Sequence, residues 1–350
     1  MIKYIFKRLA LLLLSLFIVI TITFFLMDLM PGYPKALEDA SMKDGAPDIK
    51  VLADGYGLND PIMVRYGRYM SGIFHLQFGD VYNQAYKGST IPNIFFKPLK
   101  YSMLVTVPAF VISTIVGVTL GFIAGYKRGK WQDTLINVFV MLFVAVPSFI
   151  WAIFLMLIGT RVGLPVAFEE ALGSSFEALS LVLPIITLTL GGMATLTYYT
   201  RNEVVEILKS DFIAIARAKG LSEKQIIRRH VFRNVSIPLV SIILPMFVTL
   251  LTGSLIIERF FAVPGTSSII VLAVQNKETY IILFSILFYS SLTMLVQLLV
   301  DVLYVFIDPR IKIAQSQKMS IFKRIKLAKG RKQAFNKANA KAEANVEGGK

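Results

Sequence analysis

Side chains that perform enzymatic chemistry are scarce in this sequence. Its 350 residues include no cysteine and only two histidines, His75 and His230. Disulfides, thiolate metal sites, cysteine nucleophiles and multi-histidine metal sites are therefore excluded. No Gly-x-x-x-x-Gly-Lys-Ser/Thr phosphate loop occurs, so we expect this chain to bind no ATP and no other cofactor, and any ATP-driven step to occur on another polypeptide. No nucleophile has a plausible base, because the two histidines are predicted in aqueous segments on opposite sides of a membrane, which argues against an intramembrane protease or a transferase.

The elements that position functional residues are predicted to be membrane helices. Hydrophobic residues make up 55% of the chain and charged residues 17%, and the mean hydropathy is +0.64, values that exclude disorder and disfavour a soluble globular protein. Six apolar runs of about 20 residues or longer can each cross a bilayer as a helix. They are 9–27, 101–126, 134–160, 179–200, 237–257 and 280–307. The sequence therefore predicts an all-α integral membrane protein with six transmembrane helices.

The first run follows three basic residues, as the core of a secretory signal does. It is longer than a signal core and no small-x-small cleavage site follows it, so we expect it to remain in the mature protein. Four prolines within the apolar runs are expected to kink the helices where neighbouring helices satisfy the freed carbonyls. They are Pro108, Pro147, Pro184 and Pro245.

The net charge of +15 is distributed unequally between alternate flanks of the runs. One set of flanks carries +3, +2, +4 and +9, namely residues 1–8, 127–133, 201–236 and 308–350. The other set carries +1, −2 and 0, namely residues 31–100, 161–178 and 258–279. The positive-inside rule then predicts cytoplasmic N and C termini and an external first loop. The basic surplus is explained by topology, and no nucleic-acid partner is expected.

Four regions follow from this topology. They are a first membrane helix (1–30), an extracytoplasmic loop (31–100), a core of five membrane helices (101–307) and a basic cytoplasmic tail (308–350). The tail is expected to be partly attracted to anionic lipid and otherwise disordered. In the loop, Asp60 is expected to cap a helix that begins at Pro61. Apolar residues at helical spacing give that helix a face for packing or for docking an external partner, namely Ile62, Tyr66, Tyr69, Met70, Ile73 and Phe74.

The cytoplasmic segment 201–236 has the pattern of two helices joined by a sharp turn. The first is predicted to end at Lys219, with Gly220 as its left-handed stop. Ser222 is predicted to start the second, with Gln225 completing a capping box. The second helix is expected to run to about Val235, after which the chain restarts as the fifth membrane helix. Short helices with a basic face are marginal in water, so a partner surface is expected to stabilise them.

Residues inside the membrane runs indicate packing rather than proton transfer. Gly117, Gly121 and Gly125 lie four residues apart and predict close helix packing, either within the chain or with a second subunit. Asp28 and Asp301 lie near run ends, and Asp301 is expected to pair with Arg310 or another cation. No ionisable residue is predicted at mid-membrane, which argues against a proton-coupled secondary transporter.

The sequence resembles the B-type permease of the oligopeptide, dipeptide and nickel branch of bacterial ATP-binding-cassette importers. Motifs in the family's order span nearly the whole chain: Met-Pro-Gly at 30–32, Gly-Leu-Asn-Asp-Pro at 57–61, Val-Pro-Ser-Phe at 146–149, Ala-Arg-Ala-Lys-Gly-Leu-Ser at 216–222, Arg-His-Val-Phe-Arg-Asn at 229–234, Val-Pro-Gly at 263–265, and Val-Asp-Val-Leu-Tyr with Asp-Pro-Arg at 300–310. Ala214 and Arg233 replace the Glu and Pro of the general importer motif, as is typical of the peptide branch. Gly-Thr-Ser-Ser at 265–268 and Gln-Asn-Lys-Glu-Thr-Tyr at 275–280 depart from the branch pattern, so we expect a different outer contact there.

The resemblance implies a type I importer permease fold and a coupling helix within 201–236 that sits in a groove of a cytoplasmic ATPase. The implied ATPase contacts are Ala216, Arg217, Gly220, Leu221, Ser222 and Glu223, supported by Arg228, Arg229 and His230. It also implies that a turn after the fifth membrane helix lies near the site where a binding protein delivers cargo. Anchoring of the helix end at the membrane interface is an equally good interpretation of that turn. The turn comprises Glu258, Arg259, Phe260, Phe261 and Pro264.

The implied partners are a homologous second permease subunit, two nucleotide-binding ATPases that use ATP-Mg, an extracytoplasmic substrate-binding protein and membrane lipid. The implied location is the cytoplasmic membrane of a bacterium. Peptide import by alternating access is the function that the resemblance favours. Nickel chelates, glutathione or another small solute are alternative cargoes, and a membrane scaffold or receptor that recruits a cytoplasmic partner is the alternative from another class.

Overall fold

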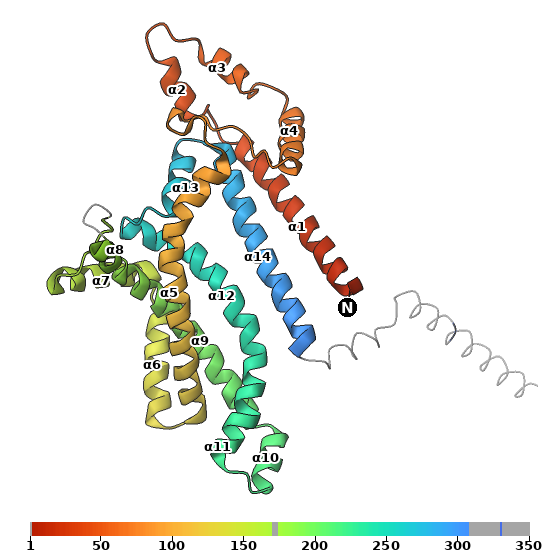
Figure 1. The fold of residues 1–350 in the computed structure, drawn as a ribbon, viewed down its shortest axis with the longest axis vertical. Coiled ribbons are helices and arrows are strands. Elements are labelled where there is room, and N and C mark those ends of the chain that lie inside the picture. Colours follow the sequence, from red (N-terminus) through yellow and green to blue (C-terminus); the bar gives the residue numbers. More distant parts are fainter. Residues whose placement is uncertain (1, 170–173, 308–329, 331–350) are drawn as a thin grey trace, which may run out of the picture. The chain divides into compact units, whose positions relative to one another are not determined.

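The computed structural model describes residues 2–169, 174–307 and 330, and the described residues form helices joined by turns, with no strand among them. The chain divides into two units, Met1–Val300 and Asp301–Lys350. The helices are α1 (Ile2–Asp28), α2 (Lys35–Ser41), α3 (Ile49–Gly55), α4 (Ile62–Phe74), α5 (Ile91–Tyr126), α6 (Trp131–Ala145), α7 (Ser148–Val162), α8 (Ser174–Ser180), α9 (Val182–Leu208), α10 (Asp211–Ala218), α11 (Glu223–Ile226), α12 (Phe232–Phe260), α13 (Thr266–Gln275) and α14 (Thr279–Ile307), with short turns η1 (Gln84–Tyr86) and η2 (Ile227–Val231) (Figure 1). The predicted tail and the Asp301 partner Arg310 lie outside the described residues.

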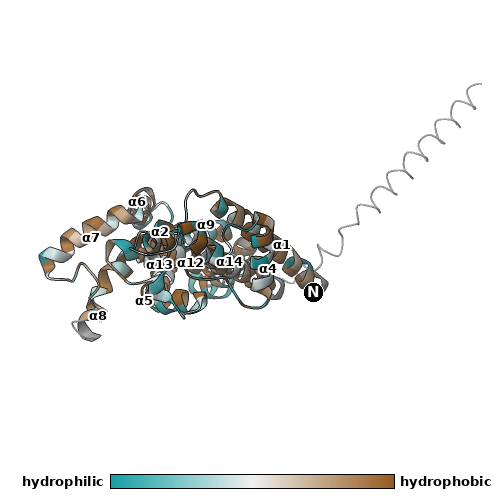
Figure 2. Ribbon diagram, turned by 90° about the horizontal axis from the view of Figure 1, so that it is seen from above, coloured by the Kyte–Doolittle hydropathy of each residue, from teal (hydrophilic) through white to brown (hydrophobic). Residues whose placement is uncertain are grey.

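Five helical stretches in the described residues are long and apolar enough to cross a membrane, and a bent pair raises the number to six. That pair is α6 and α7, which meet at 104° where one span kinked at Pro147 was expected. Pro147 has no backbone N–H and forces the preceding Val146 into an extended conformation, so α6 ends there and α7 starts anew. Hydrophobic residues predominate along α7 in Figure 2.

The other three prolines behave differently from Pro147. Pro108 and Pro245 lie within the continuous helices α5 and α12. Pro184 stands in the first turn of α9, where a backbone N–H would have no partner within the helix, so the missing N–H of proline interrupts nothing. The predicted kink is therefore confirmed at Pro147.

The fifth membrane helix does not restart near Ser236, contrary to the sequence prediction. The chain is helical from Glu223 to Phe260, and Pro238 lies inside α12. A π-type turn, η2, adds one residue to the helical repeat. It keeps Ile226 and Val231, which are five residues apart, in the same buried cluster as Val235 and Leu239. Burial of this face makes the helix continuous.

Three glycines of α5 let it pack directly on α9. A Cβ atom on Gly117, Gly121 or Gly125 would lie 2.6–2.9 Å from a backbone oxygen of α9, and the three oxygens come from every fourth residue, Met193, Thr197 and Arg201. A bulkier residue at any of them would force the two helices apart. The glycine contact predicted from the sequence thus lies within this chain.

The α2–α4 lobe, residues 31–90, carries the predicted amphipathic helix. Pro61, not Asp60, occupies the N-cap position of α4, and the Asp60 carboxylate instead pairs with Arg68. Tyr69 is buried in a cluster with α1, α5 and α14 residues, and Ile62, Tyr66, Met70 and Ile73 pack against it. Packing is therefore the role of this face, whereas Phe74 lies 82% exposed outside it.

Candidate functional site

The helix pair α10–α11 lies at the opposite end of α9 and α12 from the α2–α4 lobe (Figure 1). We call residues 211–226 the elbow. Helix α9 extends eight residues beyond the predicted end of the fourth apolar run. A two-residue bend then separates α9 from the elbow. The elbow is thus the direct continuation of two long helices, so a force on it acts on both.

The turn of the elbow has the geometry that its residues predict. α10 ends at Ala218 with Lys219 as its C-cap, and Gly220 has a φ of +76°. The Ser222 hydroxyl accepts the Gln225 amide N–H at 3.4 Å, and the Gln225 side chain accepts the Ser222 N–H at 3.0 Å. The left-handed stop and the capping box are confirmed. They fix both ends of the turn.

Buried residues fasten the elbow to the membrane helices. Ile213, Ala216 and Ile226 are at most 4% exposed and share a cluster with Val204 of α9 and Leu239 of α12. Ala216, expected at the ATPase surface, is therefore part of this internal contact. A short helix held by such burial moves with its neighbours instead of bending independently.

The other predicted contact residues form an accessible surface. Arg217, Gly220, Ser222, Glu223, Arg228 and Arg229 are exposed, whereas Leu221 and His230 are half-buried. Arg217 and Glu223 pair with each other across the turn, with Nε and Oε1 2.9 Å apart. The hydrogen bond from Arg217 to Glu223 raises the pKa of the Arg217 guanidinium. The pair presents opposite charges side by side.

Two further residues of the elbow were missed in the sequence. Phe212 and Ile215 are 41% and 55% exposed on α10, while Ile213 and Ala216 occupy its buried face. A helix with apolar residues on both faces lacks the usual polar outer face, and this was the available signal. Exposed apolar side chains beside charged ones are typical of a protein contact.

An ion pair between α6 and α9 was also missed. The Arg201 guanidinium donates to both carboxylate oxygens of Asp133, at 2.6 and 2.9 Å. The same carboxylate accepts the Gly129 N–H at 3.0 Å and the Asn137 side-chain amide at 2.6 Å. Because the carboxylate is fully hydrogen-bonded and Asp133 is 5% exposed, the pair clamps α6 to α9. The two residues are 68 positions apart, so local patterns give no sign of it.

The turn after α12 does not present all its residues outward. Glu258 is 1% exposed, and its carboxylate accepts hydrogen bonds from the Ser254 hydroxyl at 2.8 Å and the Ser267 N–H at 3.0 Å. Phe261 is fully buried. These two residues hold the turn together. Of the five residues predicted to face a partner, only Arg259, Phe260 and, in part, Pro264 are accessible.

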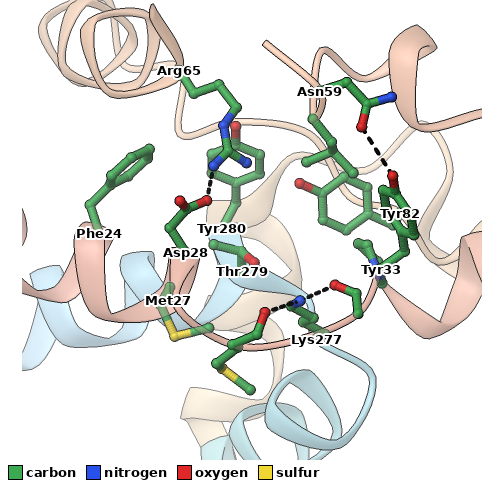
Figure 3. A pocket seen from close by; sticks show the side chains of 14 residues that line it. Phe24, Met27, Asp28, Tyr33, Asn59, Arg65, Tyr82, Lys277, Thr279 and Tyr280 are labelled. Atoms are coloured by element: carbon green, nitrogen blue, oxygen red, sulfur yellow. Dashed lines mark hydrogen bonds and ion pairs between the residues drawn. The ribbon is translucent and has the colours of Figure 1, made fainter. Parts of the chain in front are cut away.

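The unusual run 275–280 anchors the α2–α4 lobe. Lys277 donates to the backbone oxygens of Met30 and Gly32, and Arg65 pairs with Asp28 nearby, around a cavity of about 250 Å³ (Figure 3). The Glu278 carboxylate, 2% exposed, accepts the N–H groups of Tyr82 and Asn83 at 3.0 and 2.7 Å. This run therefore holds the lobe through Lys277 and Glu278, and the expected difference from the branch stays a prediction.

Glu278 makes the attachment of this lobe sensitive to pH. Burial raises the pKa of its carboxyl above the usual value, against the two amide hydrogen bonds, which lower it. The folded state then binds this proton more tightly than the unfolded state, so the contribution to stability falls as pH rises through the interval between the two pKa values. We expect the melting temperature of the wild type to fall relative to Glu278→Gln as pH rises from about 4 to about 7.

The matched control is the exposed carboxylate of Glu169, whose change to Gln should give a curve parallel to the wild type. Parallel curves for Glu278→Gln as well would contradict the assigned effect of burial.

Comparisons with known proteins identify the family of this chain and several related proteins. Residues 117–313 match the family "Binding-protein-dependent transport system inner membrane component", and residues 1–86 match its N-terminal family. An oligopeptide transport system permease protein of Mycoplasma genitalium is 36% identical over 99% of this chain and 86% of its own length. A dipeptide transport system permease protein of Lactococcus lactis is 34% identical over 89% of this chain and its full length. A chain of a solved methionine ABC transporter in an inward-facing conformation aligns with a TM-score of 0.47 and 16% identity, over 61% of this chain and 96% of that one.

The chain belongs to the family of binding-protein-dependent transport system inner membrane components. It is a multi-pass membrane protein and the permease subunit of an ATP-binding-cassette importer. In such a system a separate subunit hydrolyses ATP and a substrate-binding protein is a further partner.

Proposed function

We propose that this chain imports peptides across the cytoplasmic membrane of a bacterium, with its termini and the elbow in the cytoplasm. It pairs with a homologous second permease, and two ATPase subunits that bind ATP-Mg drive alternating access, while this chain itself binds no cofactor. The similarity to oligopeptide and dipeptide transport permeases supports the choice of peptides.

The observation that carries the mechanism is the rigid attachment of an exposed elbow to α9 and α12. Its accessible residues include Arg217, Gly220, Ser222 and Glu223, and its buried residues join both long helices. Closure of the ATPases displaces the elbow, and the buried contacts pass that displacement to the membrane helices. A flexible loop would absorb the same movement.

Gly220→Val tests this role of the elbow. A residue with a Cβ at a φ of +76° costs about 1–2 kcal/mol, so the turn will rearrange and weaken its fit to the ATPase. We expect uptake of a labelled tripeptide to fall about tenfold, with the ATPase no longer stimulated by loaded binding protein. The measurement uses the full importer in vesicles.

Gly45→Val is the matched control. Gly45 has a φ of +75° and, like Gly220, no atom within 4 Å of an added Cβ, but it lies in the α2–α4 lobe. It carries the same backbone strain and should transport at the wild-type rate. Undiminished uptake by Gly220→Val would remove the coupling assignment.

A further inference from the structure

Helix α4 lies beside the end of α1 that carries the α2–α4 lobe (Figure 1). The candidate membrane span of α1 ends at Asp28, and that of α14 begins at Thr279. Arg65, at the end of the first turn of α4, pairs with Asp28. Tyr69, one turn later, stacks on Phe24, which lies about 6 Å inside Asp28 along α1. As the chain proceeds along α4, it therefore moves from the end of the α1 span toward its interior.

After α4 the chain returns along α14. Phe78 packs edge-on against Phe284, with ring centres 4.8 Å apart. Phe284 lies five residues into the α14 span, about 7 Å deeper than its first residue. The Tyr82 N–H then donates to Glu278, which precedes α14. The deepest part of this hairpin therefore lies between Tyr69 and Phe78.

We call residues 74–77 the tip of this hairpin. Phe74 and Leu76 are 82% and 79% exposed, so both aromatic and aliphatic surface faces outward there. Residues 69–79 contain no Asp, Glu, Lys or Arg. The nearest charged side chain on α4, Arg68, extends toward Asp60 at the other end of the helix, away from the tip. Large apolar side chains exposed at this depth of a membrane span are placed to meet lipid.

The backbone of the tip makes its hydrogen bonds internally, as a segment that leaves water must. The N–H groups of His75 and Gln77 both donate to the Gly72 oxygen, at 2.9 and 2.8 Å, and the Leu76 N–H donates to the Ile73 oxygen at 3.1 Å. The His75 ring nitrogen Nδ1 lies 2.8 Å from a backbone oxygen of the preceding turn. Gly72 allows this closure, because an added Cβ would lie 2.5 Å from the Gln77 oxygen.

Backbone strain at the tip also favours contact with lipid. Leu76 has a φ of +59°, in the left-handed region that leucine rarely adopts. In water an exposed leucine gains nothing that offsets this strain. Transfer of its side chain into lipid does offset it, because apolar surface is then removed from water.

We propose that the tip enters the membrane leaflet nearest the α2–α4 lobe and contacts lipid acyl chains. Phe74 and Leu76 insert below the headgroups, while Arg65 stays at the headgroup level. Lipid then adds a further attachment for the lobe besides Lys277 and Glu278. Because it depends only on the depth of α1 and α14, this contact is independent of the cargo and of which side of the membrane the lobe occupies.

Single-cysteine variants test the depth of the tip, because the chain has no cysteine of its own. Phe74→Cys carries an environment-sensitive fluorophore in the complete importer, reconstituted in phosphatidylcholine and phosphatidylglycerol vesicles. Two quenchers are compared: a nitroxide near the head of the lipid acyl chain, and iodide in the water. We expect the nitroxide-to-iodide quenching ratio to be about fivefold higher at Phe74→Cys than at the control, Met42→Cys. Met42 is 81% exposed in the same lobe, so the two positions match in exposure.

Leu76→Cys is a second position in the tip and should give the same high ratio as Phe74→Cys. The labelled wild type measures the background from cysteines of the other subunits. Iodide quenching at the tip as strong as at Met42→Cys would overturn the proposal and place the tip in water. Protection from both quenchers would also overturn it and show that a protein subunit covers the tip. Uptake of a labelled peptide by the same vesicles tests the proposed function separately.

Discussion

Replacing Arg201 with methionine will lower the free energy of unfolding by about 3–5 kcal/mol, because it leaves the buried Asp133 carboxylate without its charged partner. Gly129 and Asn137 still donate to that carboxylate, but neither carries a positive charge. Separation of α6 from α9 should follow, and little folded protein should survive purification. Thermal unfolding of the detergent-solubilised importer measures the loss.

Arg217→Met is the matched control for this prediction. Arg217 is also paired with a carboxylate, Glu223, but both side chains are about half exposed, at 50% and 49%. Solvent screens such a pair, so its loss should change stability by less than about 1 kcal/mol. Adding Asp133→Leu to Arg201→Met should recover much of the lost stability, because no unpaired charge then remains. Equal effects of the two arginine substitutions would contradict the clamp.

The elbow could be predicted from sequence because its signals are local. The stop at Gly220 and the capping box of Ser222 and Gln225 depend on residues within four positions of one another. Short-range backbone geometry decides such features before any tertiary contact forms. The same holds for the interruption at Pro147, although the size of its bend depends on packing that the sequence does not display.

Contacts between distant residues account for most of the errors. The continuity of α11 and α12 depends on burial of Ile226 and Val231 against α9, which outweighs the stop signals at Ser236 and Pro238. Asp60 has the residue type of an N-cap, yet its carboxylate pairs with Arg68 two turns later. In both places a contact with a residue farther along the chain outweighs the structure that the local sequence signals.

Burial within the candidate sites was equally hard to predict. Glutamate in a turn is ordinarily exposed to solvent. The fold shows instead that the Glu258 carboxylate is buried and accepts hydrogen bonds from Ser254 and Ser267. A charged residue in a short turn is usually exposed, so the sequence favours the wrong environment. The sequence identified which residues form this turn, but tertiary packing determines which of them are exposed.

Replacing Gly121 with alanine will lower the free energy of unfolding by about 1–3 kcal/mol, because the new methyl group meets backbone that has no free space to retreat into. The added Cβ would lie 2.6 Å from the Thr197 oxygen and 3.1 Å from the Arg201 nitrogen. The shift of α9 that relieves this overlap also disturbs the nearby Arg201–Asp133 clamp.

Gly191→Ala on α9 is the matched control, since no atom lies within 4 Å of its added Cβ. Alanine favours helix over glycine, so that variant should be neutral or up to about 1 kcal/mol more stable. Unfolding curves that place the two variants together would show that α5 and α9 do not depend on glycine for their close approach.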